Sequence, residues 1–284
     1  MTKTNPKGFS KNQIPLYLYL TPLAIFMAAP IVFILFHAFK PMDELFMFPP
    51  SFFVYRPTME NFNALFRLTA GSTIPVSRYV FNSVVVTMAV VFSTVVTASM
   101  AGFSLSKMNF RGKGTLFTIN NLALMFVPAA VTIPRYMTIT AIGIENTYFA
   151  HILPIVAMPV VVFLIKQFMD QVPDSLIEAA TVDGAGAWRI YLGIMIPMVR
   201  PALATGAILS FQMVWGNIET SALFTTSESI RTLPFFMNTL AVAGGIAGQG
   251  IAAAAAMIMF IPNLLIFIIM QSRVMNTMAH SGLK

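Results

Sequence analysis

The sequence predicts an all-helical protein that crosses a membrane several times. Of its 284 residues, 57% are hydrophobic and only 10% are charged, whereas an ordinary soluble domain carries roughly 25% charged residues. A single soluble core of this length could not hide so much apolar surface, so lipid must cover the remainder. Segments of about ten residues with alternating hydrophobicity, which are typical of a membrane β-barrel, do not occur in the sequence. The chain has no cysteine, so stability must come from helix packing.

Six stretches without Asp, Glu, Lys or Arg are long enough to cross a bilayer. A helix needs about 20 largely uncharged residues to span a hydrocarbon layer about 30 Å thick. The predicted spans are 16–39, 80–105, 115–134, 146–165, 201–218 and 251–270. Lysines precede the first span, as they do in a signal peptide, but the apolar run continues to Phe39. That length favours an anchored helix over a cleaved leader.

The distribution of lysine and arginine predicts that both termini are cytoplasmic. With six spans the termini share one side, and a cytoplasmic N-terminus places eleven of the 17 basic residues inside. Short cytoplasmic loops carry such an excess of basic residues, and the turn with Lys107, Arg111 and Lys113 is the strongest case. The expected segments are a cytoplasmic N-terminus 1–15, a six-helix domain 16–284, external loops 40–79 and 219–250, a cytoplasmic loop 166–200 and a cytoplasmic tail 271–284.

The 166–200 loop contains a short helix with recognisable ends. Ser175 and Glu178 have the Ser-x-x-Glu spacing of a capping box, and Pro173 discourages an earlier start. Gly184 is suited to the left-handed conformation that ends a helix. Such a short helix is not stable alone in water, so it must lie against a partner. All four acidic residues assigned to the cytoplasmic side fall in this loop, namely Asp170, Asp174, Glu178 and Asp183.

A second helix is predicted after the glycines at 184 and 186. Its large side chains recur every three or four residues, which is typical of an amphipathic helix at a membrane surface. These residues are Trp188, Tyr191, Leu192, Met195 and Val199. Pro197 and Pro201 then bend the chain into the fifth span. The two helices would couple a cytoplasmic partner to the membrane; alternatively, Glu178 only caps the first helix and Ala179 and Ala180 only favour helix formation.

The string IEAATVDGAGAWRIYLGIMIPMVRP, residues 177–201, resembles the loop shared by the permease subunits of binding-protein-dependent ABC importers. The family pattern is Glu-Ala-Ala, three residues, Gly, about nine residues, and an aliphatic residue followed by a proline. Matching positions are Glu178, Ala179, Ala180, Gly184 and Pro197, with Ile194 or Ile196 in the aliphatic position and the usual Asp183 before the glycine.

Other stretches, including 39–50, 82–83 and 133–148, are similar to the carbohydrate-uptake branch of that family, and to its smaller six-helix permease of the maltose type. The resemblance implies the type I importer architecture in a bacterial or archaeal cell membrane. It also implies a homologous second permease, two ATPase subunits that use ATP and Mg, an extracytoplasmic solute-binding protein and a carbohydrate substrate. The ATPase-coupling residues it implies are Ser175, Leu176, Glu178, Ala179, Ala180, Asp183, Gly184 and Pro197. The tail, residues 280–284, departs from the usual ending of the family.

The chain lacks the motifs of an enzyme. A phosphate-binding loop needs Gly-x-x-x-x-Gly-Lys-Ser/Thr, and the basic turn at 111–115 does not have this spacing, so energy must come from another polypeptide. His37, His151 and His280 are too far apart to predict a metal site, and His151 is better explained as a packed or hydrogen-bonded helix residue. We therefore expect no catalytic residue, no bound metal, no cofactor held by this chain and no nucleic-acid partner.

Two alternatives to a sugar importer remain open from the residues. One is a membrane scaffold whose cytoplasmic helix binds a partner other than an ATPase, and the other is an importer for a different solute. An ion-driven carrier is disfavoured because the spans contain no ionisable Asp, Glu, Lys or Arg. Candidate substrate-pathway residues are Asn120, Asn121 and Asn217, which could instead join helices. Candidate contacts with the binding protein are Gly244, Gly245, Gly248 and Gln249, in a segment that is equally well explained as a flexible connector.

Overall fold

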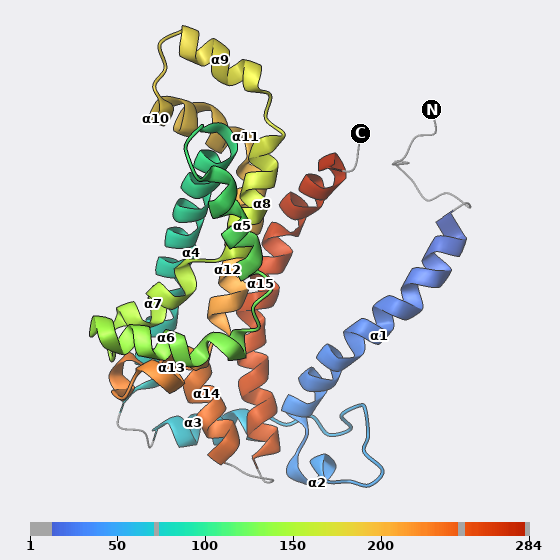
Figure 1. Cartoon of the computed structure of the whole chain (residues 1–284). Helices are drawn as coiled ribbons and strands as arrows, with labels where there is room; N and C mark the ends of the chain where they lie inside the picture. The colour runs from blue at the N-terminus through green and yellow to red at the C-terminus, as the bar shows by residue number, and fades with distance from the viewer. Residues whose placement is uncertain (1–12, 71–73, 244–247, 282–284) are drawn as a thin grey trace. The chain divides into compact units, whose positions relative to one another are not determined.

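The computed structural model describes residues 13–70, 74–243 and 248–281, and within these ranges every regular element is a helix (Figure 1). The chain divides into two compact units, which we describe separately. Unit 1 comprises residues 1–71 and 239–258, and unit 2 comprises residues 72–238 and 259–284.

Unit 1 contains α1 (Ile14–Phe39), α2 (Met42–Leu45), α3 (Glu60–Ala70) and the start of α15 (Gln249–Ser281). The chain between α1 and α3, predicted as an external loop, is held by buried charged groups. Lys40 is 1% exposed and its Nζ donates to the carbonyl of Ser51. Glu44 is 2% exposed, and its carboxylate accepts from the backbone amides of Tyr55 at 3.0 Å and Arg56 at 2.9 Å. This connection is therefore an ordered structure.

Asn61 ties the end of α1 to α3. Its Nδ2 donates to the carbonyls of Ala38 at 3.0 Å and Lys40 at 2.8 Å. At the start of α15, a Cβ built on Gly250 would lie 2.1 Å from Asn61 Oδ1. Only a glycine at position 250 therefore leaves room for the Asn61 side chain in this position.

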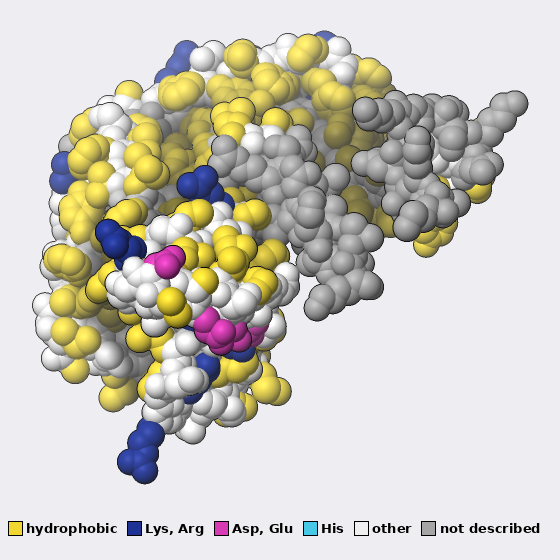
Figure 2. Space-filling view, turned by 90° about the horizontal axis from the view of Figure 1, so that it is seen from above, with side chains coloured by type: hydrophobic (Ala, Val, Ile, Leu, Met, Phe, Trp, Pro, Cys, Tyr) yellow, Lys and Arg dark blue, Asp and Glu magenta, His cyan; other side chains and the backbone are white. Residues whose placement is uncertain are grey.

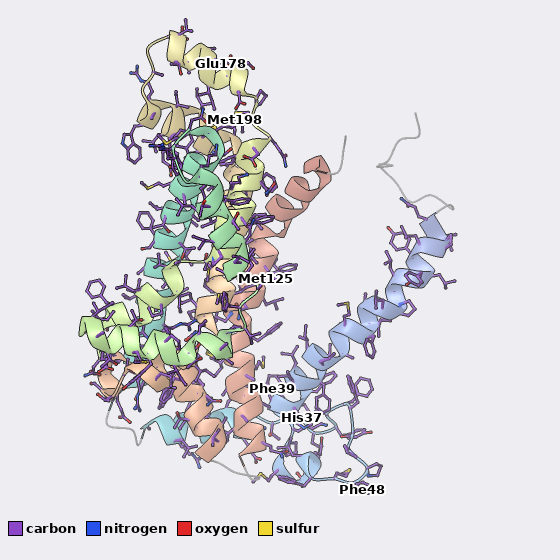
Figure 3. The ribbon with its side chains drawn as sticks, in the orientation of Figure 1. His37, Phe39, Phe48, Met125, Glu178 and Met198 are labelled. Atoms are coloured by element: carbon purple, nitrogen blue, oxygen red, sulfur yellow. The ribbon has the colours of Figure 1, made fainter. Side chains whose placement is uncertain are left out.

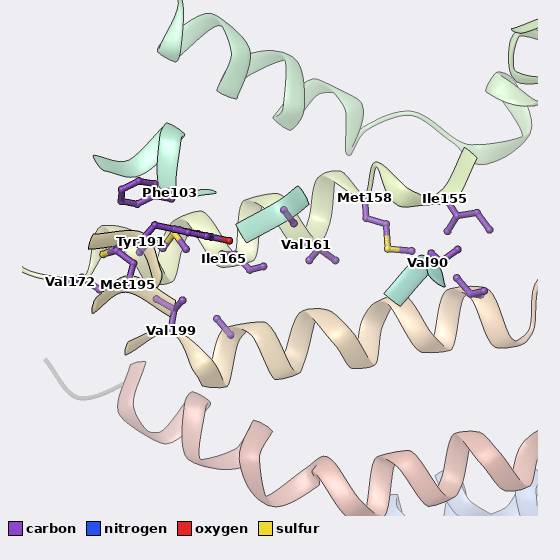
Figure 4. Close-up of a cluster of buried hydrophobic side chains, with 14 of the residues drawn as sticks. Val90, Phe103, Ile155, Met158, Val161, Ile165, Val172, Tyr191, Met195 and Val199 are labelled. Atoms are coloured by element: carbon purple, nitrogen blue, oxygen red, sulfur yellow. The ribbon is translucent and has the colours of Figure 1, made fainter. Parts of the chain in front are cut away.

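The core of unit 2 is formed by α4 (Val76–Lys107), α8 (Pro159–Asp170) and α12 (Arg200–Trp215), each of which contacts the other two. Buried side chains such as Val90, Val161 and Ile165 fill the space between them (Figure 4). Two glycines set the spacing. A Cβ on Gly102 would lie 3.1 Å from Ile165 Cγ2, and a Cβ on Gly206 would lie 2.8 Å from Val161 Cγ1. Small residues allow such close approach of membrane helices.

Two of the six predicted spans, 115–134 and 146–165, contain a break in the helix, and a third bend lies just before the span predicted at 201–218. The prediction of one uninterrupted helix at 115–134 is wrong, because α5 (Lys113–Ala123) and α6 (Pro128–Ile142) meet at 113°. Pro128 has no amide hydrogen and the preceding residue is extended, so the helix restarts there instead of continuing. Met125 marks the break (Figure 3). The pair α7 (Tyr148–Val156) and α8 is bent by 45°, and residues Ala187–Met198 meet α12 at 79°.

Among the described residues, three helices, α1, α4 and α15, are individually long and apolar enough to cross a membrane. The number rises to six if each bent pair forms one span.

Residues 225–233, called the 225–233 segment below, are fixed by side chains of α4. The segment follows α13 (Glu219–Phe224), contains η3 (Glu228–Ile230) and leads to α14 (Leu233–Ala243). Asn82 is fully buried, and its Nδ2 donates to the carbonyls of Ser229 at 2.9 Å and Arg231 at 2.8 Å. The amide of Leu233 donates to Ser83 Oγ at 2.7 Å. Within unit 2, this segment lies at the opposite end of α4 from α9 (Asp174–Val182) (Figure 1).

His151 on α7 links the same segment to α13. Its side chain is fully buried, with Nδ1 2.9 Å from Thr220 Oγ1 and Nε2 3.1 Å from the carbonyl of Ile230. A carbonyl oxygen only accepts, so Nε2 carries the hydrogen. The sequence-based prediction that His151 is a packed, hydrogen-bonded helix residue is confirmed.

Replacing Gly206 by alanine is expected to destabilise unit 2 by about 1–3 kcal/mol, because the added methyl overlaps Val161. Thermal unfolding of the purified chain in detergent measures the change. Gly114→Ala is the matched control, since nothing lies within 4 Å of its Cβ. Adding Val161→Ala to Gly206→Ala should recover part of the loss, and strictly additive losses would contradict this explanation.

The variant Asn82→Leu is expected to loosen the 225–233 segment. It leaves two backbone carbonyls and the hydroxyl of Tyr148, which donates to Asn82 Oδ1 at 2.6 Å, without partners. Each unsatisfied buried group costs about 1–3 kcal/mol. Hydrogen exchange followed by mass spectrometry should show faster exchange in this segment. Asn109→Leu, in an exposed turn, should leave the exchange unchanged, and unchanged exchange in Asn82→Leu would refute the assigned role.

Candidate functional site: the 166–200 loop

The short helix α9 begins two residues earlier than a capping box at Ser175 predicts. It starts at Asp174 with Pro173 at the N-cap, and no side chain caps it. The predicted capping box between Ser175 and Glu178 is therefore wrong. Proline lacks an amide hydrogen and adopts the extended conformation required just before a helix, so α9 starts directly after Pro173. Ser175 then lies inside the first turn instead of ahead of it.

The other end of α9 is as predicted. Gly184 has a φ of +80°. Its amide donates to the carbonyl of Thr181 at 3.0 Å, and the amide of Ala185 donates to the carbonyl of Ala180 at 2.8 Å. These two hydrogen bonds form a Schellman motif. No atom lies within 4 Å of a Cβ built on Gly184, so glycine is required there by backbone conformation and not by crowding.

One side of α9 packs on the core of unit 2, and the other side is exposed. Ile177 and Ala180 pack against the buried core cluster. Leu176 is 42% and Val182 88% exposed, and Ser175, Glu178, Ala179 and Asp183 are exposed as well. Figure 3 places Glu178 on this helix, and Figure 2 shows acidic side chains among apolar ones on the face seen from above. The open side therefore offers apolar and acidic groups to a partner.

The predicted amphipathic helix is interrupted. The chain forms α10 (Ala187–Ile190), a π-helical turn (Tyr191–Met195) and α11 (Ile196–Met198), which contains Pro197. The wider π turn changes which residues share a face. Tyr191, Met195 and Val199 are buried as one face, but Trp188 and Leu192 are 63% and 60% exposed, so the prediction that all five share a face is wrong.

Two of the predicted pathway asparagines are engaged in local structure. Asn120 Nδ2 donates to the carbonyl of Pro159 at 3.2 Å, which joins α5 to the start of α8. Asn217 Oδ1 accepts from the amide of Thr220 at 3.0 Å, and the Thr220 hydroxyl oxygen lies at the same distance. In contrast, Asn121 Oδ1 is buried and has no hydrogen-bond partner in the described part of the chain. Its role in a substrate pathway stays a prediction.

The predicted binding-protein contacts are only partly described. Gly244 and Gly245 lie outside the described residues. Gly248 is buried and its carbonyl accepts from the amide of Ala252 at 2.8 Å, while Gln249 is exposed at the start of α15. Gly248 and Gln249 therefore belong to the beginning of a helix, and their contact with a partner stays a prediction.

Sequence reasoning missed an ion pair between α6 and α13. Arg135 Nη1 lies 3.1 Å from Glu219 Oε1, and the two side chains are 27% and 32% exposed. Both charges stand just beyond the ends of predicted spans, and their separation of 84 residues gave no signal in the sequence. Across the described ranges, no group of three or more His, Asp or Glu residues is arranged to hold a metal ion.

Comparison with known proteins identifies the family. Residues 20–273 match the family described as "Binding-protein-dependent transport system inner membrane component". The probable ABC transporter permease protein YurM of Bacillus subtilis is 30% identical over 95% of this chain and 86% of its own length. The trehalose/maltose transport system permease protein MalG of Thermococcus litoralis is 29% identical over 81% of this chain and 82% of its own length.

A solved structure supports the fold. One chain of a bacterial ABC transporter involved in the import of the acidic polysaccharide alginate matches with a TM-score of 0.74 and 17% identity, over 94% of this chain and 99% of that chain. The present chain therefore has the type I ABC permease fold and belongs to the family of inner membrane components of binding-protein-dependent transport systems.

Proposed function

We propose that this chain is a permease subunit of an ATP-driven importer for a sugar or oligosaccharide, located in the cell membrane. It would work with a second permease, two ATPase subunits and an extracytoplasmic binding protein. The proposal rests mainly on the short helix α9. This helix ends at Gly184, its inner side packs on the core and its outer side is exposed. Such a helix is suited to docking on a partner.

The sugar substrate is supported by the relatives. MalG is named for trehalose and maltose transport, and the structural match belongs to an importer of a polysaccharide. Hydrogen-bonding side chains without a net charge suit sugar hydroxyls, and Asn121 offers a buried carbonyl oxygen with no partner among the described residues.

In this mechanism the ATPase subunits bind ATP and Mg, and movement of an ATPase subunit displaces α9. Because Ile177 and Ala180 contact the core cluster, the displacement reaches α4 and α8. The chain after α9 continues through the π turn into α12, which packs closely on α8 at Gly206. Helices packed this tightly move as units, so the substrate pathway would open alternately to each side.

A bulky residue at position 184 is expected to uncouple ATP hydrolysis from uptake. A leucine at position 184 disfavours the left-handed backbone conformation with a φ of +80°, which costs about 1–2 kcal/mol in an L-residue. The end of α9 is therefore distorted in Gly184→Leu. Proteoliposomes containing the complex should hydrolyse ATP while sugar uptake falls about tenfold. Gly186→Ala is the control, because Gly186 has a φ of −75° and an open surrounding. Normal uptake in Gly184→Leu would refute the role of this helix end.

Cross-linking tests the identity of the partner. The chain has no cysteine, so single cysteines can be introduced without background. Leu176→Cys and Val182→Cys should form cross-links to an ATPase subunit in the assembled complex, while Ile177→Cys on the inner side should not. Cross-links from both outer positions only to a protein without ATPase activity would favour a scaffold and overturn the proposed function.

A further inference from the structure

A largely buried lysine connects the end of α4 to the base of α9. Lys107 is the last residue of α4, and its side chain is 6% exposed. Its Nζ donates to the carbonyl of Val172 at 2.6 Å and to Asp174 Oδ1 at 2.6 Å. Val172 lies after the end of α8 and Asp174 is the first residue of α9. One ammonium group therefore holds both sides of the short connection between these helices, an arrangement called the Lys107 clamp below.

Neighbouring polar contacts keep the clamp in place. Ser106 Oγ donates to Asp170 Oδ1 at 2.7 Å, and Lys166 Nζ donates to Asp170 Oδ2 at 2.6 Å. Lys113 Nζ, at the start of α5, donates to the carbonyl of Ser106 at 2.9 Å. The ends of α4 and α8 and the start of α5 are therefore joined directly beside Lys107, so its side chain projects from a fixed base.

The electrostatics favour a persistent link. A buried ammonium group is costly unless it is hydrogen-bonded, and the Lys107 ammonium has two oxygen acceptors. The hydrogen bond and the charge of Lys107 lower the pKa of Asp174 below its ordinary value. The carboxylate therefore stays ionised at neutral pH, and its contribution is lost only as the pH falls through this lowered pKa. Asp174 itself is 76% exposed, so the strength of the clamp comes mainly from the enclosed lysine and the Val172 carbonyl.

We propose that Lys107 is the positioning residue that makes α9 move together with α4. The proposal rests on the proposed function, in which an ATPase subunit displaces α9. With the clamp intact, that displacement is passed to α4 and so to the core. Without it, α9 turns about the connection at 172–173, and only the packing of Ile177 and Ala180 on the core remains to transmit the motion of the ATPase. The role is specific to Lys107 because its ammonium contacts both Val172 and Asp174.

The test uses the complete importer in proteoliposomes, with uptake of labelled sugar and release of phosphate measured together. In Lys107→Met, the ATPase subunits should still copurify and ATP hydrolysis should continue, while uptake per ATP falls about tenfold. A charged hydrogen bond of ordinary strength, once lost, shifts an equilibrium by about this factor. Asp174→Ala should have a smaller effect, and the double variant should be no worse than Lys107→Met alone, since both changes remove the same pair.

A matched control comes from the turn that follows α4. Arg111→Met removes an exposed basic residue from this turn, and uptake per ATP should stay within about twofold of the wild type, as for surface substitutions in general.

A spin label on α9 gives a readout that does not depend on transport. Val182 is 88% exposed and the chain has no other cysteine to label, so Val182→Cys, labelled in the purified chain without ATPase subunits, reports the motion of α9 alone. The label should be more mobile when Lys107→Met is added and unchanged when Arg111→Met is added. If Lys107→Met does not assemble, the same measurement with Asp174→Ala decides the matter.

The outcomes separate the two proposals. Unchanged label mobility together with unchanged uptake per ATP in the variants overturns the clamp. A wild-type complex in which ATP hydrolysis does not drive sugar uptake overturns the proposed function instead. In that case the label on α9 still decides whether Lys107 holds this helix to α4.

Discussion

The close approach of α4, α8 and α12 is the constraint on which the rest of unit 2 depends. Lipid chains are as apolar as the side chains between these helices, so burial from water does not drive their association. The association must come from close packing of complementary helix surfaces. Gly102 and Gly206 allow this packing because they leave room for the side chains of Ile165 and Val161. Both ends of unit 2 are built on this packing: α9 packs on the core cluster, and the 225–233 segment is hydrogen-bonded to Asn82 of α4.

The irregular backbone of the 225–233 segment is supported by polar side chains from neighbouring helices. An unpaired backbone group in an apolar environment is costly. In this segment, carbonyls are bound by Asn82 on α4 and by His151 on α7. Polar side chains in the predicted spans therefore have a structural role here.

Composition was sufficient to predict a helical membrane protein, and the loop motif was sufficient to place α9 and its glycine end. Hydropathy could not show that residues 115–134 form two helices, because it records apolar character and not helix direction. The prediction of a capping box at Ser175 was wrong because the helix begins directly after Pro173. A rule based on the spacing of Ser175 and Glu178 does not take that proline into account. The π turn at 191–195 was also missed, since periodicity assumes an ordinary helix.

Contacts between distant parts of the chain were likewise beyond sequence reasoning. Arg135 meets Glu219, and Lys107 meets Val172 and Asp174, only because the helices that carry them are packed together. In the sequence Lys107 counted as one basic residue of a cytoplasmic turn. Its enclosed position, which gives it a mechanical role, depends on the arrangement of α4, α8 and α9.

The narrow space at Gly250 has a consequence for unit 1. Any larger residue there must push Asn61 aside, and Asn61 is the side chain that holds the carbonyls of Ala38 and Lys40 where α1 ends. A methyl group added near the C-terminal end of the sequence would therefore release the first helix from its anchor, about 200 residues earlier in the chain. A substitution at Gly250 would therefore change the structure at the end of the N-terminal helix α1, far from the substituted position in the sequence.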